Sequence, residues 1–385
     1  MRQDAKQAWR RLGAILCSGS LAVLTGCSGF FQAVNNNGSS GSSSYVYVTN
    51  AGGTLAEYSL ASGVLTAFSG SPATLPLAPT CLAVAPNNAF LYVGTASGVF
   101  LYTVGSDGTL TEGNDNTVIY LNQSGLQVQS MVVDATSSWL IMTYQNSTEI
   151  DALPVSATTG LGGTTVYSAT LKNSTTSPKV AIAPSNTAVM VALGTTGAEV
   201  IGFTPSASGT PFASSASVIA PSASSYAATA VASDPTSTYL YITEASTANP
   251  AVAGKLRLFK FASLTTELSG SPYTTGIGPS AILPDATGAY LYVANSNDNT
   301  LSGFTINTTS QALTALSSTI PTAKDPIALA EDASKTYIFA VGNGSNPNLW
   351  MYAFDSAGDG TLDVKTSTST LSTSPSEGNG IGLVD

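Results

Sequence analysis

PDATGAYLYVAN, at residues 284–295, is the stretch of sequence that decides the fold. It leads from the end of a short apolar run through a turn into an aromatic-rich strand, and this strand recurs every 45 to 51 residues. The seven copies begin at Tyr45, Phe90, Trp139, Ala188, Tyr239, Tyr290 and Tyr337. Periods of this size are typical of β-propeller blades, each of which has four short strands and packs against its two neighbours.

The two ends of this repeat array predict how the ring closes. No apolar inner strand precedes the first copy at Tyr45, whereas the chain ends in GIGLVD at residues 380–385, which matches the missing strand. A C-terminal strand that completes the first blade would remove the free sheet edges of an open array. The sequence therefore predicts an all-β fold, a single seven-bladed β-propeller over residues 45–385 that is closed by its own C-terminal strand.

The first 44 residues read as a targeting segment followed by a tether. Four basic residues precede an apolar stretch at residues 12–24, and thirteen residues are too few to cross a bilayer as a helix. The stretch ends in Leu24-Thr25-Gly26-Cys27, which is similar to the lipobox of bacterial lipoproteins. We expect a signal peptide at 1–26, lipidation of Cys27 and a flexible Gly/Ser-rich tether at 27–44. The alternative is an ordinary secretory peptide with an incidental cysteine.

Lipidation would place the protein in the bacterial cell envelope, with the N-terminal lipid as its only membrane contact. Because Ser28 rather than an aspartate follows the cysteine, the sequence resembles lipoproteins that are sorted to the outer membrane. The side of that membrane on which the domain lies stays open.

The composition of the mature chain excludes several partners. Without residues 1–26, eight Lys and Arg remain against twenty-one Asp and Glu, a net charge of −13, which repels nucleic acid. Cys81 is then the one cysteine besides the lipidated residue, so we expect no disulfide and interpret Cys81 as a small buried side chain. We expect a monomer.

Two repeats carry a resemblance to a known family. Tyr47-Val48-Thr49-Asn50 and Tyr292-Val293-Ala294-Asn295 resemble the signature of YVTN-type β-propeller repeats. The blade pattern is also similar to the seven-bladed bacterial lactonase family, which includes 6-phosphogluconolactonases, and the likeness covers residues 45–385. This resemblance implies the propeller fold and suggests lactone hydrolysis, although propellers host many unrelated functions.

The residue types that most hydrolases use are scarce in this chain. There is no histidine, which removes the commonest general base, the Ser-His-Asp triad and imidazole metal sites. Arg257 is the one arginine after residue 26, which argues against a phosphorylated substrate. Arg257 lies in the alternating stretch KLRLFK at residues 255–260, and we predict that its side chain faces solvent.

The recurring carboxylates predict structure rather than chemistry. An aspartate follows the inner strand in most repeats, and a group repeated in this way is expected to cap the same turn. Its copies are Asp134, Asp234, Asp285, Asp332 and Asp385. The stretch DSAGDGTLD at 355–363 aligns with the hairpin of the second repeat and lacks the full oxygen-ligand pattern of a calcium loop, so we interpret it as a turn. No metal site and no organic cofactor are assigned.

The loops that gather around the propeller axis are the expected place for a ligand site. Polar residues in the loops between second and third strands, and in those that lead into the inner strands, would form an oxygen-rich mouth for sugars, a peptide segment or a hard cation such as calcium. The ligand-binding candidates are Asn50, Gln129, Lys179, Asn295, Lys324, Asn343 and Glu377.

Two functions from different classes fit these observations. The first, which we favour from the sequence, is an envelope-anchored scaffold that binds a protein or a glycan, because every usual catalytic group would need an unusual replacement. The alternative is a lactone hydrolase, 6-phosphogluconolactonase-like or metal-assisted, in which Glu244, Asp298 or Asp325 activates water with or without a divalent ion.

Overall fold

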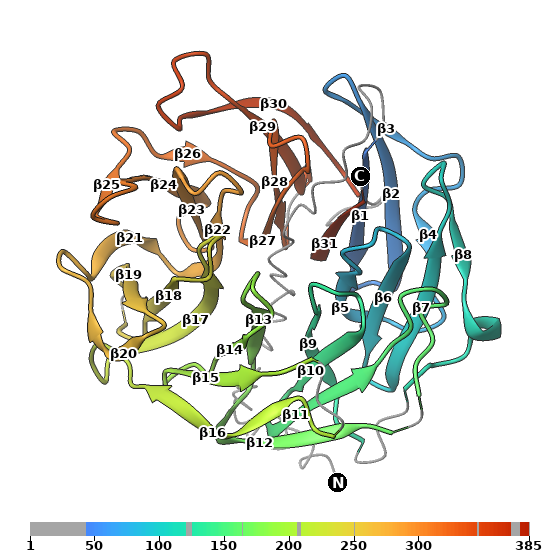
Figure 1. Ribbon diagram of the computed structural model, residues 1–385. Helices are drawn as coiled ribbons and strands as arrows, with labels where there is room; N and C mark the ends of the chain where they lie inside the picture. The colour runs from blue at the N-terminus through green and yellow to red at the C-terminus, as the bar shows by residue number, and fades with distance from the viewer. Residues whose placement is uncertain are drawn as a thin grey trace, which may run out of the picture.

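Seven antiparallel sheets stand around a central axis and form a closed β-propeller (Figure 1). The computed structural model describes residues 44–120, 125–163, 165–205, 209–249, 251–344, 346–370 and 378–384. The predicted signal peptide, Cys27, Glu377 and Asp385 lie outside these residues. No helix in the described ranges has the length and apolar character needed to cross a membrane.

Each blade has an inner, a second, a third and an outer strand. The inner strands are β31 (Gly378–Val384), β5 (Pro79–Val84), β9 (Val128–Val133), β13 (Lys179–Ile182), β17 (Tyr226–Ser233), β22 (Pro279–Pro284) and β27 (Pro326–Glu331), in blades 1 to 7. The second strands are β1 (Ser44–Asn50), β6 (Phe90–Thr95), β10 (Trp139–Tyr144), β14 (Ala188–Ala192), β18 (Tyr239–Ser246), β23 (Tyr290–Asn295) and β28 (Tyr337–Gly342).

The third and outer strands complete the blades. The third strands are β2 (Thr54–Ala61), β7 (Gly98–Val104), β11 (Ser147–Pro154), β15 (Ala198–Phe203), β19 (Ala253–Lys260), β24 (Thr300–Ile306) and β29 (Leu349–Phe354). The outer strands are β3 (Val64–Ala67), β8 (Leu110–Glu112), β12 (Tyr167–Thr175), β16 (Phe212–Ile219), β20 (Ser263–Glu267), β25 (Leu313–Ala315) and β30 (Leu362–Thr368). Short additions are β4 (Ala73–Thr74), β21 (Tyr273–Ile277), β26 (Ile320–Pro321) and the 3₁₀ turn η1 (Asn114–Asn116).

The C-terminal strand closes the ring, as the sequence predicts. β31 pairs with β1 from Tyr45↔Val384 to Asn50↔Gly378, and every residue of β31 is buried. The inner strands also contact one another in sequence around the axis, and β31 lies between β27 and β5. Blade 1 is therefore built from both ends of the described chain, which confirms the predicted closure.

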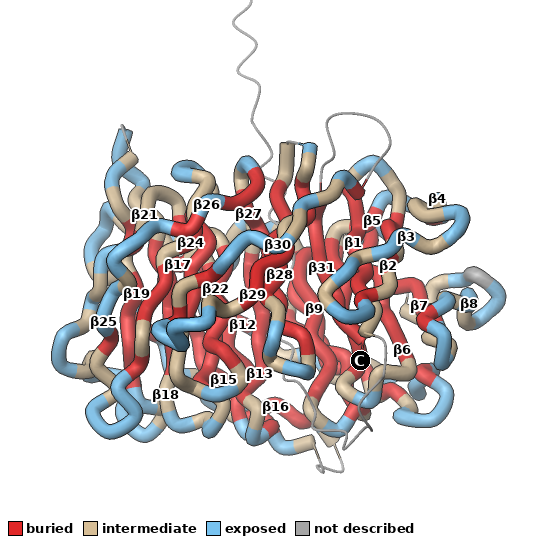
Figure 2. Tube along the Cα trace, turned by 90° about the horizontal axis from the view of Figure 1, so that it is seen from above, coloured by how far each residue is buried: buried red, intermediate tan, exposed pale blue. Residues whose placement is uncertain are grey.

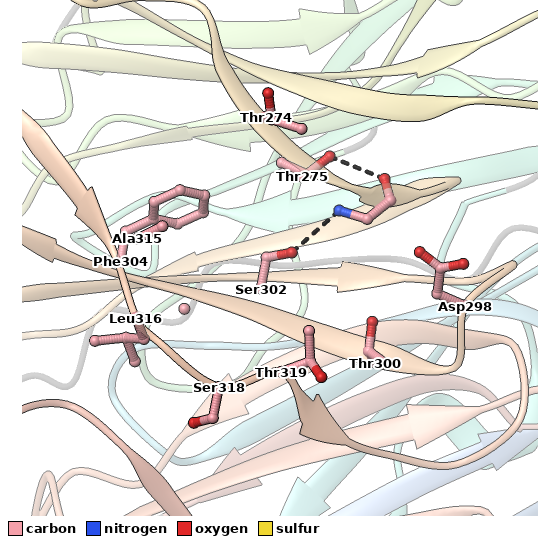
Figure 3. Close-up of a pocket in the computed structure, with 12 residues that line it drawn as sticks. Thr274, Thr275, Asp298, Thr300, Ser302, Phe304, Ala315, Leu316, Ser318 and Thr319 are labelled. Carbon is pink, nitrogen blue, oxygen red and sulfur yellow. Dashed lines mark hydrogen bonds between the residues drawn. The ribbon is translucent and has the colours of Figure 1, made fainter.

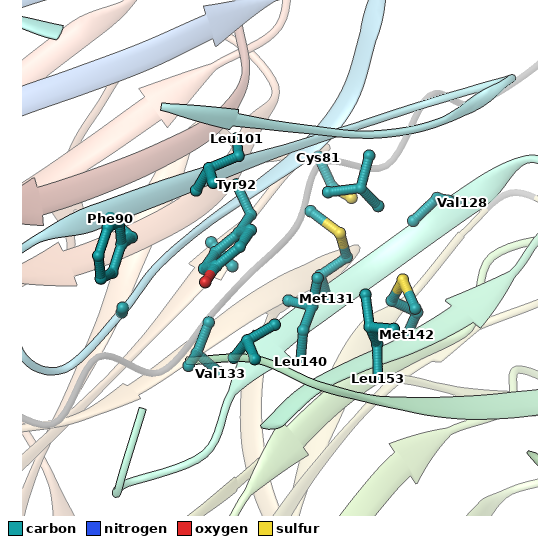
Figure 4. Close-up of a cluster of buried hydrophobic side chains, with 14 of the residues drawn as sticks. Cys81, Phe90, Tyr92, Leu101, Val128, Met131, Val133, Leu140, Met142 and Leu153 are labelled. Atoms are coloured by element: carbon teal, nitrogen blue, oxygen red, sulfur yellow. The ribbon is translucent and has the colours of Figure 1, made fainter. Parts of the chain in front are cut away.

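The hydrophobic core lies between adjacent blades. Buried strands form the body of the ring, and exposed loops cover its two faces (Figure 2). Because side chains alternate along a strand, Met131 and Val133 of β9 face blade 2, whereas Val132 faces blade 4. Cys81 is fully buried in the cluster between blades 2 and 3 (Figure 4), which confirms its interpretation as a small core residue.

At three of the blade junctions, the central tyrosine of the repeat forms a hydrogen bond with the next blade. The hydroxyl of Tyr47 donates to the carbonyl of Gly108 at 2.6 Å, and Tyr92 and Tyr292 donate in the same way to Gly160 and Gly360. These three glycines have positive φ, and a Cβ at Gly108 would lie 2.1 Å from the Tyr45 ring. The hairpin tips therefore require glycine, because its absent side chain lets the preceding blade approach.

The repeated aspartates cap the turns between inner and second strands. Asp134 Oδ1 accepts hydrogen bonds from the amides of Ser138 and Trp139 at 2.7 and 2.6 Å. Asp234, Asp285 and Asp332 make the corresponding bonds, which confirms their predicted structural role. The hairpin at 355–363 is likewise a turn, in which Asp355 accepts from the amide of Ala357.

A second set of bonds on this side joins neighbouring blades. The fourth turn residue of one blade accepts a backbone N–H from the turn of the preceding blade: Ser137 accepts from Asn87 at 3.0 Å, and Ser237 accepts from Ser185 at 2.7 Å. Blade 7 has Lys335 at this position, which cannot accept. There the carboxylate of Glu331, at the end of β27, accepts the amide of Ala286 at 2.7 Å instead.

Candidate functional site

The two faces of the ring differ in what they expose. We call the face with the aspartate-capped turns the turn face, and the opposite face, where the inner strands begin, the mouth face. Neighbouring inner strands are linked at the mouth: Asn379 Nδ2 donates to the carbonyl of Pro79 at 2.5 Å, and Thr80 Oγ1 donates to that of Val128 at 2.6 Å. These bonds fix the backbone around the axis.

Asn50 and Asn295, both ligand-binding candidates, end the second strands of blades 1 and 6 and are fully buried. Asn50 Nδ2 donates across the hairpin to Thr54 at 3.2 Å, and Asn50 Oδ1 accepts from Thr370 at 2.6 Å. Asn295 Nδ2 donates to Thr300 and to Ser302 at 3.2 and 2.9 Å. The asparagine of the YVTN-like motif therefore holds the hairpin that follows it. A ligand role for either residue stays a prediction.

Two further candidates stand next to each other around the ring. Gln129 is the second residue of β9 in blade 3, Lys179 is the first residue of β13 in blade 4, and each residue is only 3% exposed. β9 and β13 are in contact, and the amide of Val180 donates to Ser130 Oγ at 3.1 Å. The mouth thus combines a buried glutamine and a buried lysine side chain on one side of the axis.

Lys324, Asp325 and Asn343 come together where the chain enters blade 7. The amide of Asn343 donates to the carbonyl of Asp325 at 2.9 Å, and the amide of Asp325 donates to Asn299 Oδ1 at 2.8 Å. Lys324 is exposed and Asp325 is half-buried. Asp325 has φ 50, a left-handed conformation in which aspartate and asparagine are well tolerated.

The environment of Asp325 suits a proton acceptor. Burial raises the pKa of the Asp325 carboxyl above its usual value, and the neighbouring Lys324 ammonium lowers it in part. A carboxylate with a raised pKa is a stronger base than an ordinary surface carboxylate.

Glu244 lies between blades 4 and 5, and its carboxylate already has partners. It is fully buried, accepts from Arg257 Nη1 at 2.8 Å and accepts from the amide of Ser222 at 3.0 Å. Arg257 Nη2 also pairs with Glu267 at 2.7 Å. Glu244 is thus committed to neutralising a buried guanidinium.

The prediction that Arg257 faces solvent is wrong. Its side chain is 8% exposed, because β19 is covered by blade 4 on the face to which Arg257 points. Arg257 Nη1 also donates to the carbonyl of Ala220, at 2.6 Å. The alternating pattern of the strand identified the residues that share a face, but it could not show that this face is a junction between blades.

Asp298 lies in the hairpin loop between β23 and β24 and is exposed. Its Oδ2 accepts the amide of Ile277 at 2.5 Å, and it borders a groove between blades 5 and 6 (Figure 3). The three carboxylates predicted as catalytic candidates therefore occupy three different environments. Only Asp325 combines a mouth position, partial exposure and a raised pKa.

One buried cluster went unnoticed in the sequence. Asp151 of β11 is fully buried and accepts hydrogen bonds from Tyr144, Tyr120 and Ser168 at 2.5, 2.7 and 2.6 Å. Burial, and then the charge of Asp151, raise the pKa of Tyr144, so its hydroxyl stays protonated. The available signal was Tyr144 itself, a large aromatic residue at the end of a second strand where three of the other six repeats have Thr or Asn.

The sequence matches one protein family along most of its length. The family model described as lactonase, 7-bladed β-propeller, matches residues 43–370. No curated protein matches the chain.

Solved structures similar to this chain share its fold at low identity. A proposed 6-phosphogluconolactonase from Bacteroides fragilis has a TM-score of 0.67 at 14% identity, covering 91% of this chain and 100% of that one. The periplasmic gluconolactonase PpgL of Pseudomonas aeruginosa has a TM-score of 0.64 at 15% identity, covering 89% and 99%. A Lactobacillus plantarum protein has a TM-score of 0.66 at 16% identity, covering 89% and 99%.

Proposed function

The chain belongs to the lactonase family of seven-bladed β-propellers, and we propose that it hydrolyses the ring ester of an unphosphorylated sugar lactone at the mouth face. The match to the family model, over residues 43–370, carries this proposal. It takes the place of the binding scaffold as the favoured function, because the family match outweighs the scarcity of the usual catalytic residues. The position and raised pKa of Asp325 support it.

In the proposed reaction Asp325 acts as the general base. A water molecule attacks the lactone carbonyl carbon while its proton passes to the Asp325 carboxylate. The ring C–O bond then breaks, and the departing alkoxide takes a proton back from the Asp325 carboxyl, which regenerates the carboxylate and leaves a hydroxy acid. General base catalysis of this kind contributes about 10² to 10⁴ in rate. Lys324, beside Asp325, would favour the negative charge that develops on the carbonyl oxygen.

No step in this reaction uses a metal ion. The described residues contain no group of three or more His, Cys, Asp or Glu side chains close enough together to hold one. Carbonyl and amide oxygens at the mouth could still supply ligands to a hard cation. The assay below therefore includes a chelator.

The buried position of Arg257 supports an unphosphorylated substrate. A phosphate group is best recognised by a planar guanidinium that offers two hydrogen bonds. Arg257 is the one arginine beyond residue 26, and its guanidinium is already paired with Glu244 and Glu267. The Pseudomonas aeruginosa neighbour is a periplasmic gluconolactonase, which offers the matching unphosphorylated substrate for a test.

The assay compares D-glucono-1,5-lactone with its 6-phosphate at equal concentration and follows acid release with a pH-stat. We expect turnover above the spontaneous rate, with the unphosphorylated lactone preferred, and a loss of about 100-fold or more in Asp325→Asn. Asp363→Asn, in an exposed hairpin of the same blade, is the matched control and should keep full activity. Absence of turnover across a lactone panel, both with calcium, magnesium or manganese and with EDTA, would exclude the proposal.

A binding scaffold for a protein or a glycan is the second candidate. It is favoured by the absence of histidine and by the commitment of Glu244 to an ion pair. The test is a pull-down from envelope extracts with the purified protein. Retention of one partner, combined with no lactone turnover, would favour the scaffold over the enzyme.

We also propose that the protein is a lipoprotein anchored at Cys27 in the outer membrane. The support is the basic and apolar N-terminal segment that ends in the lipobox-like tetrapeptide. Metabolic labelling with a radioactive fatty acid should mark the wild type and not Cys27→Ala. Equal labelling of both proteins would contradict lipidation at this residue.

A further inference from the structure

A groove of about 490 Å³ runs between blades 5 and 6, away from the inner strands that line the axis (Figure 3). Its walls come from β21 at the edge of blade 5 and from β24, β25 and the segment before β26 in blade 6. The size is within the range of small-molecule sites. Six hydroxyl side chains line it: Thr274, Thr275, Thr300, Ser302, Ser318 and Thr319.

Much of the hydrogen-bonding capacity of this groove is unused within the described residues. Thr274, Ser318 and Thr319 are exposed, and their hydroxyls make no hydrogen bond there. Ser302 Oγ accepts the amide of Gly276 at 3.1 Å, and no described group accepts the Ser302 hydroxyl proton. Asp298 uses one carboxylate oxygen for Ile277, and the other has no described donor. The groove therefore offers both donors and acceptors to a ligand.

The groove also has an apolar side. Figure 3 shows Phe304, Ala315 and Leu316 together, with Asp298 on the opposite side of the lining. Leu316 is half-buried and Ala315 is exposed, so apolar surface is accessible there. A wall of hydroxyls facing a small apolar patch matches a sugar ring, which has hydroxyls at its rim and C–H groups on its faces.

The corresponding groove between blades 4 and 5 has a similar volume, about 560 Å³, but different chemistry. Strand register aligns the two blades, because Tyr239↔Lys260 corresponds to Tyr290↔Thr305. With this alignment Arg257 corresponds to Ser302, Glu244 to Asn295, Lys255 to Thr300 and Glu267 to Ala315. Every charged residue that lines the groove between blades 4 and 5 thus corresponds to a neutral residue in blade 6.

Gly276 lets the polar wall of this groove close on Asp298. A Cβ at residue 276 would lie 2.6 Å from Asp298 Oδ2 and 2.7 Å from Asn295 Cγ. Any larger residue would therefore displace the carboxylate. Asp298 adds negative charge at one end of the groove, and no basic side chain lines it.

We propose that the groove between blades 5 and 6 is a binding site for a neutral saccharide, that its lining does not include Asp325, and that binding there is independent of lactone hydrolysis. The unused hydroxyls hydrogen-bond the sugar, and Ala315 and Leu316 contact its C–H face. The lack of cationic side chains in the lining and the presence of Asp298 disfavour sulfated or uronic acid-containing saccharides.

The test is calorimetric titration of the full-length protein with neutral oligosaccharides, in parallel with anionic ones of the same length. The triple variant Thr274→Val, Ser318→Ala, Thr319→Val removes three hydroxyls that make no described hydrogen bond, so folding should be unaffected. Three lost hydrogen bonds at about 0.5–1.5 kcal/mol each predict a 10-fold or greater loss of affinity. The matched control, Thr265→Val in the groove between blades 4 and 5, should bind as the wild type does.

A second variant, which fills the groove, tests the proposal without relying on the small free energies of single hydrogen bonds. Thr274→Arg places a long charged side chain in the groove from an exposed position and should abolish binding while lactone turnover stays unchanged. The proposal is overturned if no neutral saccharide binds the wild type, if the triple variant binds as the wild type does, or if anionic saccharides bind more tightly. If the wild type binds the saccharide but shows no lactone turnover, only the proposed hydrolase activity is overturned.

Discussion

On the turn face, blades 3, 5, 6 and 7 carry the same aspartate in the same turn, whereas one third-strand position holds a different residue in every blade. This position pairs with the fourth residue of each aromatic-rich strand. From blade 1 to blade 7 it is Ala56, Phe100, Asp151, Glu199, Arg257, Ser302 and Trp350. Four blades thus share one polar residue, whereas the third-strand position holds apolar, aromatic, polar and charged residues in different blades.

The difference lies in what each group contacts. The repeated aspartates accept hydrogen bonds from amides of their own turn, so the same residue fits all four blades that carry it. The variable residue faces chain that comes from the preceding blade: Glu199 accepts the amide of Lys172 at 2.7 Å, and Arg257 donates to Ala220. A residue that recurs in the repeats therefore has a structural role within its own blade. A position that varies from blade to blade lies at a junction with the preceding blade, and its contacts differ at each junction.

Removal of residues 379–385 should have the largest effect, because both classes of contact require a closed ring. The deletion exposes the inner edge of β1 and removes a strand in which every residue is buried. We expect a loss comparable with the whole stability of a domain, about 5–15 kcal/mol, seen as loss of the cooperative melting transition. A melting curve like that of the full-length chain would contradict the closure.

Replacing the residue at the variable position should lower the free energy of unfolding strongly at Arg257 and mildly at Ser302. Arg257→Met leaves Glu244 buried without its counter-ion and should destabilise the fold by about 3–5 kcal/mol in urea unfolding. Ser302→Ala, at the equivalent position, removes the acceptor of two hydrogen bonds, from the Gly276 amide and from Asn295 Nδ2, and should cost about 1–2 kcal/mol. The double variant Arg257→Met, Glu244→Gln should recover part of the loss. Equal costs at the two positions would show that the junctions do not differ.

Blade 7 differs from the other blades on the turn face, because the carboxyl of Glu331 accepts the hydrogen bond from the preceding blade. We expect this difference to appear in the pH dependence of stability. Burial raises the pKa of Glu331 to about 7. Between its ordinary value of 4.5 and about 7 the unfolded chain has released this proton while the folded chain keeps it, so stability is lost as pH rises through this window.

The measurement is urea unfolding of wild type and Glu331→Gln between pH 4.5 and 7.5. The neutral glutamine can still accept a hydrogen bond from the amide of Ala286. The free energy of unfolding of the variant should therefore rise relative to that of the wild type as pH rises, by at most about 3 kcal/mol. Asp363→Asn, at an exposed position, serves as the control. Parallel pH dependences of wild type and Glu331→Gln would rule out the raised pKa.

The sequence was sufficient for the fold and for the repeated residues, but not for the contacts of the variable ones. Blade number, closure by the C-terminal strand, the aspartate caps and the burial of Cys81 all follow from periodicity and local pattern. The burial of Arg257 does not, because its partners come from β18, β20 and the chain that leaves blade 4. Asn50 illustrates the same limit, since its partner Thr370 lies 320 residues away.

The pH dependence of kcat/KM for lactone hydrolysis tests the central claim, that Asp325 activates water at the mouth face, most directly. Because burial raises the pKa of Asp325, the account predicts that the activity of the wild type declines as pH falls through a midpoint above the ordinary aspartate value. In Asp325→Asn this acid limb should disappear together with at least 99% of the rate, about a 100-fold loss. An unchanged rate and an unchanged acid limb in Asp325→Asn would contradict the account.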